Sequence, residues 1–256
     1  MITLKKPHEV AKMRRAGVVV ADVHKLMEEM IRPGVDTLSL DKATEELLSR
    51  ESAKAAFKGY RVQGIRHPFP GSICASINEE VVHGIPGAER VLQEGDIISI
   101  DVGAVVDGYF GDAARTYAVG EISQQRRKLL DVTYKALRIG IEQTLPGNTI
   151  GDIGHAIEAW VIAEGYGLVR DYAGHGIGKR LHEPPQVPNH GRTGTGLTLK
   201  HGLTFCIEPM VMSGKEPVKS LGNGWTVVTV DGSDAAHFEH TVLVTEDGVE
   251  ILTPWE

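Results

Sequence analysis

The sequence predicts an α+β fold made of two related halves, each with two helices followed by two strands, around a central antiparallel sheet. Residues 95–101 and 202–208 share a leading glycine, the same apolar pattern and a final acid. Pro-Gly pairs at 33–34 and 146–147 each precede a helical stretch. The repeat period of about 110 residues is far longer than that of a solenoid, so it indicates duplication of a half-domain.

The helices are marked by the spacing of their apolar residues. A first helix is indicated by side chains that recur at helical intervals: Val10, Met13, Gly17, Val20 and Met27. Residues 40–50, after the first Pro-Gly pair, and residues 153–164, after the second, predict one further helix in each half.

The strands of the first half are expected to form a hairpin. Residues 96–103 are apolar and β-branched, which is typical of a buried strand, and they contain Asp101. After a turn at 106–111, residues 112–119 open a second strand at Asp112. A hairpin of these two strands would bring both aspartates together.

The second half repeats this arrangement of acids. Residues 203–208 end in Glu208, and residues 235–244 carry Glu239 inside what reads as one strand. We therefore expect a second hairpin, with the acids of both halves converging on a central pseudo-twofold axis.

Five side chains in these segments and between them can bind a metal: Asp101, Asp112, His175, Glu208 and Glu239. Buried carboxylates cost several kcal/mol each unless they are paired or bound to metal. Four oxygen donors and one nitrogen donor are too many for one zinc ion, but they suit two divalent cations that share carboxylates. The predicted chemistry is metal-assisted hydrolysis.

The composition sets limits on the class of protein. A chain of 256 residues with 41% hydrophobic content can bury its core as one domain spanning residues 1–256. The net charge of −7 argues against a general nucleic-acid binder. Two cysteines, Cys74 and Cys206, give no disulfide framework. Since no signal peptide or membrane span is recognisable, we expect a cytoplasmic protein.

Five motifs occur in order along the chain, at residues 76–86, 174–178, 181–187, 207–210 and 238–241. In these motifs, and over nearly its whole length, the chain resembles the type I methionine aminopeptidases of the pita-bread metallopeptidase superfamily. The resemblance implies a pita-bread fold. It also implies removal of the N-terminal methionine from nascent proteins and peptides when the second residue is small, by attack of a metal-activated water on the first peptide bond.

The resemblance further implies a role for each ligand. Asp101 would chelate one ion, Asp112 and Glu239 would bridge both, and His175 and Glu208 would bind the other. Glu208 would also accept the proton of the water. One imidazole among oxygen donors suits manganese, iron(II), cobalt or zinc.

The remaining site residues are also assigned by resemblance. His182 would steady the carbonyl oxygen of the substrate, and His83 would contact the peptide nitrogen and assist the leaving amine. The apolar slot for methionine would be lined by four side chains, with His83 at its edge: Phe69, Cys74, Leu181 and Trp225. The chain departs from the family at three places. Leu181 stands where relatives commonly carry Phe, residues 59–68 have no close counterpart, and His237 replaces a frequent Gln.

Two alternatives remain open. An Xaa-Pro aminopeptidase or dipeptidase shares the fold, but usually carries a separate N-terminal domain, and the match around Cys74 and Trp225 favours methionine. A non-catalytic pita-bread protein that binds peptides or ribosomes would typically lose ligands, whereas all five are present here. The expected partners are N-terminal methionines of nascent chains and, transiently, the ribosome. We expect a monomer with no nucleic-acid specificity and no membrane contact.

Overall fold

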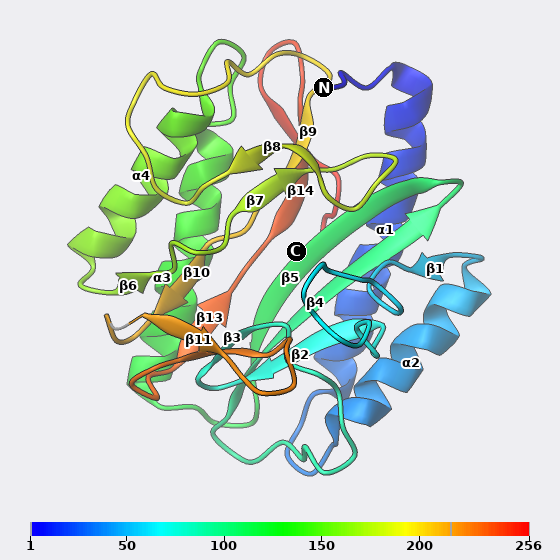
Figure 1. Cartoon of the computed structure of the whole chain (residues 1–256), viewed down its shortest axis with the longest axis vertical. Helices are drawn as coiled ribbons and strands as arrows, with labels where there is room; N and C mark the ends of the chain where they lie inside the picture. Colours follow the sequence, from blue (N-terminus) through cyan, green and yellow to red (C-terminus); the bar gives the residue numbers. More distant parts are fainter. Residues whose placement is uncertain (1, 216, 256) are drawn as a thin grey trace.

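The computed structural model describes residues 2–215 and 217–255 and shows two halves side by side, each with two helices and a sheet (Figure 1). The first half contains α1 (Pro7–Met30), α2 (Thr37–Arg50), β1 (Lys54–Ala55), β2 (Ile73–Ile77), β4 (Ile97–Val106) and β5 (Tyr109–Ala118). The second contains α3 (Gln124–Glu142), α4 (Ile150–Ala163), β7 (Gly174–Gly176), β8 (Glu183–Val187), β9 (Thr204–Ile207), β14 (His240–Val244) and β15 (Val249–Ile251).

Two smaller sheets complete the structure. One consists of β3 (Glu80–Val82), β11 (Val218–Ser220) and β12 (Val227–Thr229), and the other of β6 (Gly167–Leu168), β10 (Met210–Met212) and β13 (Ala235–His237). Every strand pair in the described part of the chain is antiparallel. The predicted α+β class and antiparallel pairing are confirmed.

Helices α2 and α4 begin before the residues predicted for them, at Thr37 and Ile150 instead of residues 40 and 153. The reason is capping. The Asp36 carboxylate accepts a hydrogen bond from the Ser39 N–H at 2.9 Å. Thr149 forms a reciprocal capping box with the residue at the third helical position. These polar caps satisfy the free N–H groups of the first turn, so each helix starts ahead of its apolar stripe.

The turn before each of these helices is the same in both halves. Gly34 and Gly147 have φ angles of +88° and +92°, a region that favours glycine. The N–H of Gly34 donates to the carbonyl of Leu92 at 2.8 Å, and the N–H of Gly147 donates to the carbonyl of Leu199 at 3.0 Å. The internal repeat seen in the sequence therefore corresponds to a repeated backbone contact.

The hairpin of β4 and β5 has a tighter turn than predicted. Residues 107–108 alone form the turn, and both have positive φ, as a two-residue type I′ turn requires. Asp112 consequently lies inside β5 instead of opening it. Asp101 is opposite Ala114 and Asp112 is opposite Gly103, so the two aspartates form a diagonal pair on one face of the hairpin.

The predicted second hairpin is wrong. Strands β9 and β14 do pair, with Ile207 opposite His240, but β10 to β13 lie between them in the chain. Glu208 follows β9, and Glu239 lies in the break between β13 and β14. The chain changes partner at this break, because β13 pairs with β10 and β14 pairs with β9.

The two halves meet where β5 runs beside β14 at the centre of the molecule (Figure 1). The N–H of Glu239 donates to the carbonyl of Ala114 at 2.8 Å. The Thr241 hydroxyl donates to the carbonyl of Asp112 at 2.8 Å. These bonds bring the acids of the second half next to those of the first.

Each pair of helices packs against the strands of its own half. Met27, Leu40 and Ile100 are fully buried in the core of the first half, and Leu137 and Phe205 in the core of the second. In residues 2–215 and 217–255, no helix has the length and apolar character needed to cross a bilayer.

Candidate functional site

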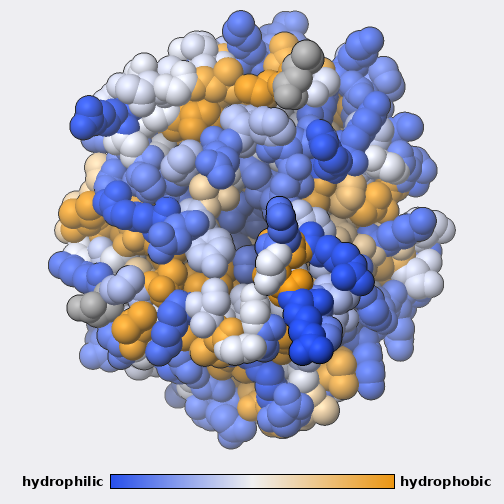
Figure 2. Space-filling view, in the orientation of Figure 1, coloured by the Kyte–Doolittle hydropathy of each residue, from blue (hydrophilic) through white to orange (hydrophobic). Residues whose placement is uncertain are grey.

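One cavity collects every site residue predicted from the sequence. It has a volume of about 560 Å³, which lies within the usual range for small-ligand sites. The face of the molecule seen in Figure 2 is hollowed near its centre. The predicted residues among those lining the cavity are Phe69, Cys74, His83, Asp101, Asp112, His175, Leu181, His182, Glu208, Trp225 and Glu239.

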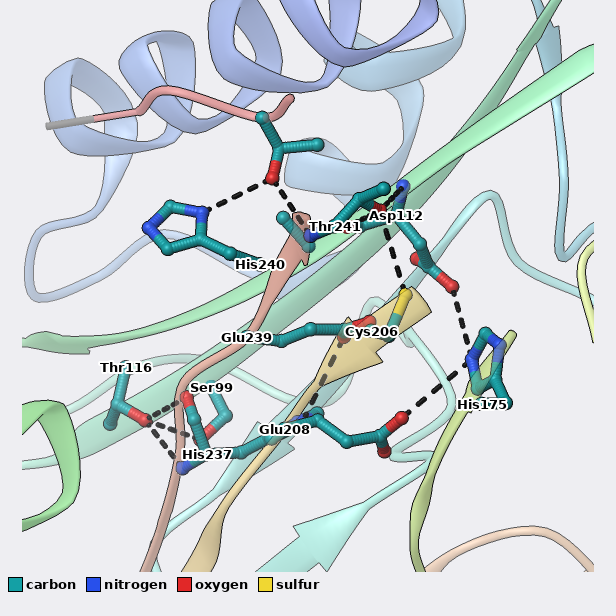
Figure 3. Close-up of polar contacts among 12 residues, drawn as sticks. Ser99, Asp112, Thr116, His175, Cys206, Glu208, His237, Glu239, His240 and Thr241 are labelled. Carbon is teal, nitrogen blue, oxygen red and sulfur yellow. Dashed lines mark hydrogen bonds and ion pairs between the residues drawn. The ribbon is translucent and has the colours of Figure 1, made fainter. Parts of the chain in front are cut away.

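All five predicted metal ligands line this cavity, and Figure 3 shows four of them, Asp112, His175, Glu208 and Glu239, close to one another. His175 Nε2 lies 3.6 Å from Glu208 Oε1 and 3.9 Å from Asp112 Oδ2. Four potential ligand atoms lie within 4.8 Å of one another, one from each of Asp112, His175, Cys206 and Glu239. Two atoms that bind the same ion at about 2.0–2.2 Å lie no more than about 4.4 Å apart, so this spacing suits ligands of one ion or of two adjacent ions.

The carboxylates lack partners of their own. Each of the four carboxylates has one buried oxygen that lacks a hydrogen-bond partner within the described residues: Asp101 Oδ1, Asp112 Oδ1, Glu208 Oε1 and Glu239 Oε1. An unsatisfied buried oxygen is costly, and native structures rarely contain several together. Divalent cations would satisfy all four, so the donor set fits metal ions.

The titration of these acids leads to the same conclusion. Burial raises the pKa of Asp101, Asp112, Glu208 and Glu239, and for the last three the charges of neighbouring acids raise the pKa further. Without added positive charge the four groups would not all be ionised at neutral pH. A bound cation favours the ionised form of every one of them.

His175 is held in the tautomer that a metal requires. Its Nδ1 lies 3.0 Å from the carbonyl oxygen of Gly176. A carbonyl can only accept, so Nδ1 carries the hydrogen and Nε2 presents a lone pair toward Asp112 and Glu208. Burial lowers the pKa of His175 to about 3, which keeps the ring neutral.

Two further residues lie beside the ligands. Burial raises the pKa of the Cys206 thiol, which lies 3.5 Å from the Thr241 hydroxyl, so the sulfur stays protonated and is a weak ligand. His237 Nε2 lies 3.9 Å from Glu239 Oε2 and, within the described residues, has no hydrogen-bond partner. Figure 3 shows His237 close to Glu239 and Glu208, so it borders the ligand set.

The apolar slot adjoins the ligands because of strand register. Cys74 on β2 is directly opposite Asp101 on β4. Phe69 and Trp225 meet edge to face with ring centroids 5.3 Å apart. With Leu181, these slot residues are between 2% and 6% exposed, so the walls of the slot are buried and mainly apolar.

His83 stands between the slot and the open part of the cavity. Its φ angle of +60° is unusual for a residue with a side chain and is a form of strain that concentrates at functional sites. The ring meets those of Tyr172 and Trp225 edge to face, with centroids 5.8 Å and 6.3 Å apart. Burial lowers the pKa of His83 to about 4, so the imidazole is neutral at pH 7.

Three aromatic residues of the cavity were not predicted from the sequence: Phe57, Tyr60 and Tyr172. The Tyr60 hydroxyl lies 2.6 Å from His182 Nδ1, although the two residues are separated by 122 positions. Tyr60 belongs to the loop at residues 59–68, and no local pattern links it to a histidine so far along the chain.

Comparison with known proteins agrees with this geometry. Residues 11–246 match metallopeptidase family M24. A methionine aminopeptidase of Clostridium acetobutylicum is 51% identical over 99% of this chain and 99% of its own. The crystal structure of methionine aminopeptidase from Thermotoga maritima has a TM-score of 0.95 and 47% identity, and covers 99% of each chain. A prolidase from Pyrococcus furiosus shares the fold, with a TM-score of 0.74, 23% identity and coverage of 99% of this chain and 66% of its own. The chain therefore belongs to metallopeptidase family M24, among the bacterial methionine aminopeptidases, and is a metal-dependent hydrolase.

Proposed function

We propose that the protein removes the N-terminal methionine from nascent proteins and peptides whose second residue is small. The observation that carries this proposal is the position of the apolar slot beside the ligand set. Since Cys74 and Asp101 are cross-strand neighbours, a side chain in the slot places its own amino group and first peptide bond at the carboxylates. The methionine aminopeptidase of Clostridium acetobutylicum, 51% identical over the same length, supports this substrate class.

Two divalent cations of manganese, iron(II), cobalt or zinc fit the donor set. Asp101, Asp112, His175, Glu208 and Glu239 would hold them. When bound, such a pair of cations makes water nucleophilic at neutral pH, polarises the scissile carbonyl and anchors the amino terminus.

Three side chains of the cavity have separate roles in the reaction. Glu208 accepts the proton of the attacking water, and this proton is then available for the leaving amine. His182 donates a hydrogen bond to the carbonyl oxygen as negative charge develops there. His83, at the edge of the slot, contacts the nitrogen of the bond that breaks. The preference for a small second side chain would follow from crowding on this leaving side by His83 and the rings of Tyr172 and Trp225 that it contacts.

An assay on three peptides tests the proposal. Metal-loaded protein should release methionine from Met-Ala-Ser, while Met-Leu-Ser and an Xaa-Pro peptide such as Ala-Pro-Ser remain intact. The Glu239→Ala variant, prepared identically, is the control for a contaminating peptidase. Preferential cleavage of the Xaa-Pro peptide would assign the chain to the proline-specific branch, and binding without cleavage of any peptide would assign a non-catalytic role.

The proposed function includes the domain organisation, location and oligomeric state of the enzyme. Residues 1–256 act as one catalytic domain, in a cytoplasmic monomer that meets its substrates as they leave the ribosome and contacts the ribosome transiently. Neither a nucleic-acid sequence nor a membrane is a partner in this proposal.

A further inference from the structure

Tyr60 reaches across the rim of the cavity to His182. Its hydroxyl oxygen lies 2.6 Å from His182 Nδ1, and the two rings meet edge to face with centroids 5.3 Å apart. Both side chains line the cavity. The contact is therefore a short hydrogen bond between two side chains of the cavity wall.

The direction of this bond follows from the groups available. In a neutral imidazole one nitrogen carries the hydrogen and the other accepts. If Nδ1 were the donor, the phenolic hydrogen of Tyr60 would have to turn to solvent, because the hydrogen bonds within residues 2–215 and 217–255 provide it with no other acceptor. Burial raises the pKa of Tyr60 above its ordinary value of 10.0, so the hydroxyl keeps its hydrogen and can donate it. Donation to Nδ1 joins the two side chains directly and places the hydrogen of the His182 ring on Nε2.

This is the opposite of the arrangement at the neighbouring ring. His175 donates from Nδ1 to the carbonyl of Gly176 and leaves the lone pair of Nε2 for the ligand set. His182, with a hydroxyl donor at Nδ1, is left with Nε2 as an N–H donor. A main-chain acceptor and a side-chain donor thus set two adjacent histidines in different tautomers.

The backbone around Tyr60 links it to the methionine slot. The N–H of Tyr60 donates to the carbonyl of Phe57 at 2.8 Å, and the carbonyl of Tyr60 accepts from the N–H of Phe69 at 2.9 Å. The indole N–H of Trp225 donates to the carbonyl of His67 in the same loop at 3.0 Å. Two slot residues, Phe69 and Trp225, therefore hold the loop that carries Tyr60.

We propose that Tyr60 is a positioning residue that holds His182 in the Nε2–H tautomer and so makes it the hydrogen-bond donor to the substrate carbonyl oxygen. This role rests on the proposed function of the cavity. A donor aimed at that oxygen stabilises the charge that develops there, whereas the lone pair of the other tautomer would repel it. The loop at residues 59–68 thereby gains a function in the chemical step.

The tautomer can be read directly by NMR. Zinc-loaded protein labelled with ¹⁵N in its histidines is examined by long-range ¹H–¹⁵N correlation, and the His182 signals are those missing from His182→Ala. In wild type, His182 should show an acceptor-type Nδ1 and a protonated Nε2. Tyr60→Phe keeps the ring but removes the hydroxyl, so the His182 nitrogens should shift toward a mixture of tautomers while those of His175 stay in place.

Tyr172→Phe is the matched control, because it removes a hydroxyl from the same cavity while its ring contacts His83 and not His182. Its His182 signals should match those of wild type. A His182 that is protonated at Nδ1 in wild type, or that is unchanged by Tyr60→Phe, would overturn the proposal.

Kinetics provide the second readout. Tyr60→Phe should lower kcat on Met-Ala-Ser by about 10-fold to 10²-fold with little change in KM, because the donor acts on the developing charge and not on the bound ground state. An unchanged kcat in a protein that cleaves the peptide would refute the positioning role. The NMR experiment needs no turnover, so absence of methionine release would count against the proposed function alone.

Discussion

The imidazole rings of His175 and His182 lie edge to face, with centroids 4.2 Å apart and planes inclined at 65°. Each ring is held at Nδ1, His175 by the carbonyl of Gly176 and His182 by the hydroxyl of Tyr60. In the proposed site these two partners have opposite hydrogen-bonding character, so His175 would offer a lone pair to metal and the adjacent His182 an N–H to substrate. This division separates binding of the ions from stabilisation of the reacting carbonyl.

The first prediction concerns this division. His182→Ala should bind metal nearly as wild type does, yet kcat on Met-Ala-Ser should fall by about 10² to 10⁴ because a donor to the developing charge is lost. His175→Ala is the matched comparison and should lose metal affinity as well as activity. Metal content and kcat are measured on the same preparations, and loss of metal from His182→Ala would show that His182 is a ligand.

The second prediction concerns the methionine slot. Leu181 is 4% exposed, and Leu181→Ala removes apolar surface that the substrate side chain would cover. At about 0.8 kcal/mol per lost methylene, kcat/KM for Met-Ala-Ser should fall by about 10-fold to 10²-fold while metal content is unchanged. Leu145→Ala, at an exposed leucine outside the cavity, should leave kcat/KM as in wild type. An unchanged kcat/KM in Leu181→Ala would remove this residue from the slot.

The third prediction concerns stability at acid pH. His24 is fully buried, with Nδ1 2.9 Å from the Tyr117 hydroxyl and Nε2 3.1 Å from the carbonyl of Ala113. Burial lowers its pKa from 6.5 to about 3. Below pH 6.5 the unfolded chain binds a proton at His24 that the folded chain does not, so stability is lost as the pH falls from 6.5 toward 3.

His24→Gln removes this linkage. The difference in unfolding free energy, wild type minus variant, should shrink by up to about 1.4 kcal/mol for each pH unit below 6.5. Denaturant titrations at neutral pH and at several values below pH 6.5 measure it, and contributions of the metal ligands cancel between the two proteins. Parallel stability curves would show that His24 does not titrate on unfolding.

Much of the first half of the site could be predicted from sequence because its geometry is local. Asp101 and Asp112 belong to consecutive strands joined by an Asp-Gly turn, and alternation along a hairpin fixes which side chains share a face. The apolar residues around Glu208 and Glu239 single out these two acids in the sequence. They do not predict how the chain brings the two acids together. The break before Glu239 depends on a hydrogen bond to Ala114, a residue far away in the chain.

The contact of Tyr60 with His182 could not be predicted for the same reason. Tyr60 follows a glycine in a polar loop, where no periodic pattern of residues predicts which way a side chain points. Its contact with His182 depends on the position of this loop, which hydrogen bonds from Phe69 and Trp225 hold in place. Motif resemblance identified His182, yet it carried no information about the partner at Nδ1.

In the proposed site, five side chains of one cavity hold a pair of divalent cations on which activity depends. The decisive experiment measures the number of bound ions and the rate of Met-Ala-Ser cleavage on the same samples, as manganese or cobalt is titrated into chelator-stripped protein. Wild type should bind two ions per chain, and cleavage of Met-Ala-Ser should appear only as they bind. Glu239→Ala, which removes the carboxylate placed between the ions, should lose the pair and most activity, while Glu250→Ala at an exposed ion pair with Arg14 should match wild type. Full activity in rigorously metal-free wild type, or an unchanged ion count in Glu239→Ala, would contradict the claim.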